Sequence, residues 1–221
     1  MTRPRLPTLA LAAALAGCAP AGIADDPVSR IFQWPQIMAG DDIGRDCATS
    51  RRERWRFVYN GVYTEQVRVY DVEAGAVETR VFDRLNLLQP DIDLFLRGAR
   101  STVTIPPQDL RRLVEAVESD LPRAARAGEH LRSDRFFWTV AACRDGRFSV
   151  AGFAYPSDGS IPFAFPAEIA RFDRSLRPVN PPRAFERDVL VMRDLYPNRM
   201  TCDLDPKFLL RVTEGGIQPG F

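Results

Sequence analysis

The segment from Phe136 to Tyr155 constrains the fold more than any other part of the sequence, because it predicts a β-hairpin together with its register. Arg144-Asp145-Gly146-Arg147 supplies a two-residue turn whose central residues tolerate positive φ. Counting outward from this turn gives the hairpin one aromatic face and a second face that is also largely apolar. We therefore expect it at the centre of a sheet or between a sheet and a helix. The predicted pairs are Cys143 with Phe148, Val140 with Ala151, Trp138 with Phe153, and Phe136 with Tyr155.

A second hairpin is predicted around Asn60-Gly61, after the alternating aromatic residues Trp55, Phe57 and Tyr59. Two loop lengths compete. Burying an aliphatic side chain stabilises by about 1.5–3 kcal/mol, whereas an exposed ion pair contributes less than about 1 kcal/mol. We therefore expect the three-residue loop, which includes Val62. The two-residue turn would pair Arg56 with Glu65 and Glu53 with Arg68, and the three-residue loop pairs Trp55 with Val67 and Tyr59 with Tyr63.

One amphipathic helix is predicted between the two hairpins. Its apolar residues recur at helical spacing, Pro106 and Pro107 suit its first turn, and Pro122 ends it. Packing of this stripe against the sheet is the expected role. The stripe consists of Leu110, Leu113, Val114, Val117 and Leu121.

The remaining segments have weaker signals. Residues 28–50 show no clean period and predict an irregular arm, and the proline-rich residues 156–187 predict long loops with a short strand near Ile169 to Phe172. Further strands are expected after the Ala74-Gly75 turn, at Val189 to Met192 and at Phe208 to Val212. The predicted fold class is α+β: an antiparallel, strongly twisted sheet with two main hairpins, one packed amphipathic helix and long proline-rich loops.

The first residues have the layout of a secretory signal, with basic Arg3 and Arg5, an apolar run from Leu6 to Leu15, and small residues at its end. The run is too short to cross a bilayer. The ending Leu15-Ala16-Gly17-Cys18 resembles the lipobox of bacterial lipoproteins. This resemblance implies cleavage before Cys18, which would carry the lipid. An ordinary cleaved signal ending at Ala14-Leu15-Ala16 is the alternative.

The resemblance divides the chain into a cleaved signal peptide (1–17), a lipidated tether (18–27) and a single α+β domain (28–221). It implies a place in the bacterial cell envelope, and Ala19, in place of Asp, favours the outer membrane facing the periplasm. Loss of Arg3 and Arg5 leaves 28 basic residues against 29 acidic ones. Such a neutral body argues against nucleic acid as a partner.

Three cysteines remain after Cys18, namely Cys47, Cys143 and Cys202. In an oxidising periplasm this odd number predicts one disulfide and one spare thiol. Loop-closure entropy varies only with the logarithm of loop length, so length does not select the pair. We favour Cys47 with Cys143.

Signals for catalysis or metal binding are weak. His130, the only histidine, lies in a polar connection and fits a surface residue better than a general base. The acid pairs Asp91/Asp93 and Asp203/Asp205 lack the further oxygen ligands of a calcium loop and fit capping roles. Motifs of serine hydrolases, zinc proteases, P-loop and dinucleotide-binding proteins are absent. No catalytic residue, metal ligand or cofactor is predicted.

Arginines 54, 56 and 68 with Tyr63 and Tyr70 could form a surface for an anionic partner, although a solvent-exposed strand face explains them as well. Three functions remain open. The favoured one is a non-enzymatic accessory lipoprotein that binds the membrane through its lipid and an envelope protein through its body. The second is a carrier of an apolar ligand in a curved-sheet cavity lined by Phe136, Trp138, Phe153 and Tyr155. The third is an envelope hydrolase that uses Cys143 or His130 with an acid.

Overall fold

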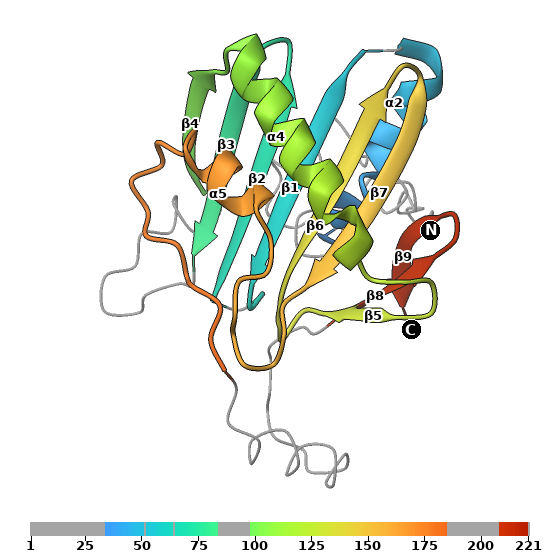
Figure 1. Ribbon diagram of the computed structural model, residues 1–221, viewed down its shortest axis with the longest axis vertical. Coiled ribbons are helices and arrows are strands. Elements are labelled where there is room, and N and C mark those ends of the chain that lie inside the picture. The colour runs from blue at the N-terminus through green and yellow to red at the C-terminus, as the bar shows by residue number, and fades with distance from the viewer. Residues whose placement is uncertain (1–33, 51, 64, 84–97, 185–207, 221) are drawn as a thin grey trace, which may run out of the picture.

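The computed structural model describes residues 34–50, 52–63, 65–83, 98–184 and 208–220. A six-stranded antiparallel sheet has the order β4-β3-β2-β1-β6-β7, and a three-stranded sheet has the order β5-β8-β9 (Figure 1). The fold is therefore α+β, as predicted. The strands are β1 (Arg54–Gly61), β2 (Gln66–Glu73), β3 (Ala76–Asp83), β4 (Ala99–Thr104), β5 (His130–Arg132), β6 (Phe136–Arg144), β7 (Arg147–Ala154), β8 (Leu209–Thr213) and β9 (Gly216–Gly220); the helices are α2 (Asp41–Ser50), α4 (Pro107–Asp120) and α5 (Phe165–Ala170), with a 3₁₀ turn at Leu121–Arg123.

The β6–β7 hairpin has the predicted register. Cys143 pairs with Phe148, Val140 with Ala151, and Trp138 with Phe153. Asp145 and Gly146 take φ values of 53° and 73°, as the two-residue turn requires. Beyond the last of these pairs, the Tyr155 amide donates to the Phe136 carbonyl at 3.1 Å, which keeps these residues opposite one another.

The predicted three-residue loop between β1 and β2 is wrong. Asn60 pairs with Val67, so the connection is longer, and Val62 (φ 61°) accepts hydrogen bonds from the amides of Glu65 and Gln66. The prediction assumed that one strand face is exposed, but every residue of β1 after Arg54 is buried. In this register Arg56 faces Asp71 and Arg54 faces Glu73 across the strands.

Helices cover both faces of the large sheet. On the face toward the viewer in Figure 1, α4 crosses the strands and α5 lies beside it, over an aromatic core. Residues 34–39, which are helical, and α2 cover the opposite face, together with the small sheet. The predicted stripe faces the core at Leu113, Val114 and Val117, whereas Leu121 is 47% exposed.

The predicted irregular arm at 28–50 is wrong from residue 34 onward, because residues 34–39 and α2 are helical. Small residues lie where this segment contacts β6 and β7, and they interrupt the apolar periodicity that would otherwise have indicated a helix. Gly40 has φ 72°, and a Cβ placed there would lie 2.4 Å from the Cβ of Ala141. This bend separates the two helical segments and brings α2 onto the sheet.

Two smaller predictions also differ from the structure. The segment Ile169 to Phe172 was expected to be a strand, but Phe165 and Ile169 are buried at helical spacing in α5. Pro166 fits the first turn of this helix. Strand β4 was not predicted at all. The strand expected after Ala74-Gly75 is β3, the one near Phe208 is β8, and Val189 to Met192 lies outside the described residues.

Candidate functional site

The four aromatic residues proposed as ligand-lining lie in two environments. Trp138 and Phe153 are 5% and 0% exposed, and the ring of Phe165 packs against both, with centroids at 5.5 and 4.9 Å. Phe136 and Tyr155 instead line a pocket of about 500 Å³ at the end of the hairpin. The middle of the aromatic ladder is thus packed core beneath α5, in a sheet that does not close into a barrel.

The pocket lies where β5, the start of β6 and the end of β7 meet the loop that follows β7. Its volume falls within the usual range for small-molecule sites. The polar residues that line it are His130, Arg132, Arg135, Tyr155, Ser157 and Asp158; the apolar ones are Leu131, Phe136, Phe137, Ala154, Pro156 and Ala184. Of these residues, the sequence had indicated Phe136 and Tyr155 as ligand-lining and His130 only as a weak candidate base, because their meeting depends on how β5 packs beside the hairpin.

Hydrogen bonds fix several of the polar groups around the pocket. Arg132 donates from Nε and Nη2 to the two carboxylate oxygens of Asp134, each at 3.0 Å. Asp158 accepts a hydrogen bond from the amide of Ser160 at 2.9 Å, and this bond lowers the pKa of its carboxyl. The indole of Trp138 donates to the Tyr155 hydroxyl at 3.0 Å. The phenol oxygen is the acceptor in this bond, so Tyr155 is tied to the packed core beside the pocket.

The pKa of Tyr155 is raised to about 12, mainly because burial disfavours its phenolate. Burial also raises the pKa values of Tyr59 and Tyr70, whose hydroxyls donate to Asn180 and Asp173. These three phenols therefore keep their protons through the neutral and mildly alkaline range.

As pH rises, we expect these three tyrosines to ionise only when the protein unfolds, above the pH at which an exposed tyrosine ionises. A raised folded pKa leaves stability intact below the unfolded value of about 10, and stability then falls as pH rises toward the folded value. The loss is about 1.4 kcal/mol per pH unit for each phenol that ionises only in the unfolded chain. Phenolate absorbance and circular dichroism measured across alkaline pH check this. Ionisation of all five tyrosines near pH 10 in a folded protein would contradict it.

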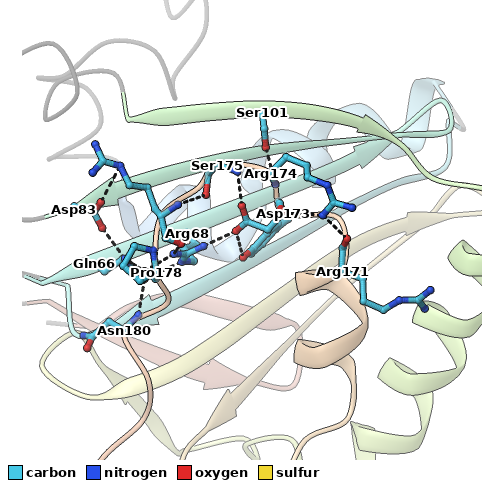
Figure 2. Close-up of polar contacts among 12 residues, drawn as sticks. Gln66, Arg68, Asp83, Ser101, Arg171, Asp173, Arg174, Ser175, Pro178 and Asn180 are labelled. Carbon is cyan, nitrogen blue, oxygen red and sulfur yellow. Dashed lines mark hydrogen bonds and ion pairs between the residues drawn. The ribbon is translucent and has the colours of Figure 1, made fainter.

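The predicted arginine and aromatic surface does not exist, because two of its arginines are buried. Arg68 is 1% exposed and forms an ion pair with Asp173. It also donates from Nη2 to the carbonyls of Arg177 and Pro178, each at 2.6 Å, and from Nε to Gln66 (Figure 2). Residues 173–180, which we term the strap, are thereby held across the first residues of β2.

The other buried arginine, Arg56, is 4% exposed on the opposite face of the sheet. Its Nε donates to Asp71 at 2.7 Å, and its other two nitrogens donate to Asp42 at the start of α2. Asp71 also pairs with Arg80. Burial alone would raise the pKa of Asp42, but Arg56 and Arg54 hold it below its usual value. These ion pairs hold α2 against the sheet.

Cys47 and Cys143 form a disulfide, which confirms the favoured pair. Cys202 lies outside the described residues. The bond removes Cys143 as a catalytic thiol in this oxidised state. His130 is exposed at the start of β5, and its ring forms no hydrogen bond or ion pair with another residue of the described segments. Within the described segments, neither Cys143 nor His130 is therefore paired with an acid as the hydrolase hypothesis requires.

The acid pairs Asp91/Asp93 and Asp203/Asp205 lie outside the described residues, as does Cys18. Elsewhere in the described segments, no three His, Cys, Asp or Glu side chains come together in a way that could hold a metal ion. Of the helices described, none is long and apolar enough to cross a membrane.

Comparisons with protein families, with curated proteins and with solved structures found no match to this chain.

Proposed function

We propose that this chain is a bacterial envelope lipoprotein, anchored to a membrane through Cys18 and facing the periplasm, whose body serves as a non-enzymatic accessory protein. The observation that carries the proposal is the disulfide between Cys47 and Cys143. Disulfides persist in secreted and periplasmic proteins and are rare in the cytosol. The disulfide is therefore consistent with the periplasmic location that the lipobox-like segment Leu15–Cys18 implies.

The charged residues of the sheet support a structural role for the body. Arg56 and Asp71 bind to each other beneath α2, and Arg68 binds Asp173, the first residue of the strap. Buried ion pairs of this kind orient elements of the fold, and they leave these side chains committed to internal contacts. An accessory protein that presents a fixed outer surface to an envelope partner is the function that best fits this arrangement.

Lipidation at Cys18 is directly testable by expression of the full chain in a Gram-negative host supplied with a clickable fatty acid. We expect the label on the wild-type protein, which fractionates with membranes, and its loss in Cys18→Ala. Intact-mass analysis then gives the cleavage site and the added mass, and fragmentation of the N-terminal peptide locates the modified residue. Cys202→Ser is the matched control and keeps both the label and the membrane fraction. A wild-type chain cleaved after Ala16, or one carrying an unmodified Cys18, would overturn the proposal.

The accessory role predicts a partner in the same membrane. Crosslinking of intact cells, followed by gentle extraction, should recover the wild-type chain with a reproducible envelope protein. The Cys18→Ala chain should recover less of it, because a lipid anchor raises the local concentration of both proteins. Recovery of the wild-type chain alone would count against this role.

A further inference from the structure

We propose that the strap is a membrane-contact element, which places Leu176 and Val179 against an anionic phospholipid surface. The inference rests on the proposed function, because it requires anchoring through Cys18, and it assigns the part of the body that turns toward the lipid. Three observations carry it: the exposure of these two apolar side chains, the bonds that hold the strap on either side of Leu176, and the basic charge beside them.

Leu176 is the most exposed large hydrophobic residue of the described segments, at 94%. Val179, three positions later, is 47% exposed. The backbone of Leu176 has a φ of 59°, in the left-handed region that a leucine rarely occupies. Such a conformation persists only where surrounding contacts impose it. The strap therefore presents an apolar side chain to solvent in a defined backbone conformation.

The contacts that impose this conformation come mainly from one buried guanidinium group (Figure 2). Before Leu176, the Asp173 carboxylate forms an ion pair with Arg68. After Leu176, the carbonyls of Arg177 and Pro178 accept hydrogen bonds from the same guanidinium group, each at 2.6 Å. Arg68 thus holds both ends of the turn that carries Leu176. A segment held in this way loses less conformational entropy on binding than a loose loop would.

The charge on the strap is basic. Arg174 is exposed and donates from Nη1 to the backbone carbonyls of residues 171 and 173, and no acidic side chain of the described segments pairs with it. Arg177 is partly exposed, with its Nε 3.7 Å from the Asp83 carboxylate. The one acid of the strap, Asp173, is paired with Arg68. Apolar side chains beside arginines are typical of segments that lie at an anionic membrane surface, because the phosphates attract the guanidinium groups while the apolar groups enter the acyl boundary.

The projection of Leu176 favours a lipid surface over a protein groove. A side chain that is 94% exposed has no wall of neighbouring residues around it. A bilayer accommodates such a projection without a complementary shape, whereas a protein partner needs a matching groove. One leucine is far smaller than a myristoyl chain, which by itself gives only marginal membrane binding. The strap therefore does not recruit the chain to the membrane; it orients a body that the lipid on Cys18 already holds there.

The test places the environment-sensitive fluorophore NBD at Leu176→Cys in the lipidated chain, with Cys202→Ser to remove the spare thiol. The protein is measured in nanodiscs of phosphatidylglycerol and in nanodiscs of phosphatidylcholine. With phosphatidylglycerol we expect NBD emission to move to shorter wavelength and to rise about twofold or more, because the probe leaves water. High salt should weaken this response. Ser149→Cys, an exposed position on the edge strand β7, is the matched label control and should not respond. An equal response at both positions would overturn the proposal.

Charge reversal tests the preference for anionic lipid. We expect Arg174→Glu to reduce the response at position 176 at least twofold, and Arg147→Glu, at an exposed arginine of β7, to leave it unchanged. An unchanged response in Arg174→Glu would overturn the assignment of an anionic surface. Val179→Cys supplies a second labelled position if Leu176→Cys misfolds. Intact-mass analysis of the same samples separates this inference from the proposed function. A lipidated chain whose probe does not respond would overturn the strap assignment alone, whereas an unlipidated chain would overturn the anchoring and the strap assignment with it.

Discussion

Replacing both Cys47 and Cys143 with alanine lowers the free energy of unfolding by about 2–5 kcal/mol. The two residues are 96 positions apart in the chain, and a crosslink across a loop of about 100 residues restricts the unfolded state by an amount worth about 4.7 kcal/mol. The bond joins α2 to β6, one strand in from the edge of the large sheet. Denaturant unfolding of oxidised wild type and of the double variant measures the difference.

The controls for the disulfide separate crosslinking from loss of two buried side chains. Reduction of the wild-type protein, followed by unfolding under reducing conditions, should give most of the same loss. Cys202→Ser should retain the wild-type midpoint, and non-reduced peptide mapping should still find the Cys47–Cys143 link. A loss below about 1 kcal/mol in the double variant would mean that the other contacts of α2 hold it to the sheet unaided.

One of those other contacts is the pair of hydrogen bonds that Arg56 donates to Asp42, a contact made in a β1–β2 register that was not predicted. The two loop lengths considered from the sequence pair Arg56 with Glu65 or Trp55 with Val67, and the observed register, with Arg56 opposite Asp71, is neither of them. Arg56 is in fact buried beneath α2, a helix that the sequence did not predict. The contact between Arg56 and α2 lies outside the two strands, so the residue pattern of β1 and β2 alone did not contain it.

The β6–β7 hairpin was predictable because its information is local. The turn residues Asp145-Gly146 and the paired side chains lie within twenty positions of one another, and all agree on one register. The same reasoning located the ladder of the candidate site but not the pocket. Whether Trp138 faces a cavity or a helix depends on α5, which begins more than twenty residues later and was predicted as a strand.

Arg68→Met lowers the free energy of unfolding by about 3–5 kcal/mol, because it breaks a buried ion pair and leaves one partner behind. In the wild type the Asp173 carboxylate accepts bonds from Arg68 and from the Tyr70 hydroxyl, and the carbonyls of Arg177 and Pro178 accept bonds from Arg68 as well (Figure 2). Without the guanidinium group, the strap loses its main attachment to β2. Arg174→Met is the matched control. Arg174 is exposed and donates to backbone carbonyls of residues 171 and 173, so we expect a change within about 0.5 kcal/mol.

The pH dependence of Arg68→Met distinguishes the ion pair from simple packing. Burial favours the neutral form of Asp173, but bonds from Ser175, Tyr70 and Arg68 hold its pKa below the ordinary 3.8. Its contribution in the wild type is therefore present above pH 3.8 and is lost as pH falls through the lower folded pKa. Loss of Arg68 raises that pKa, so acid destabilisation of the variant should begin at higher pH. Unfolding curves measured from neutral to acidic pH check this. Parallel acid profiles for wild type and variant would show that Arg68 stabilises the strap through its backbone bonds alone.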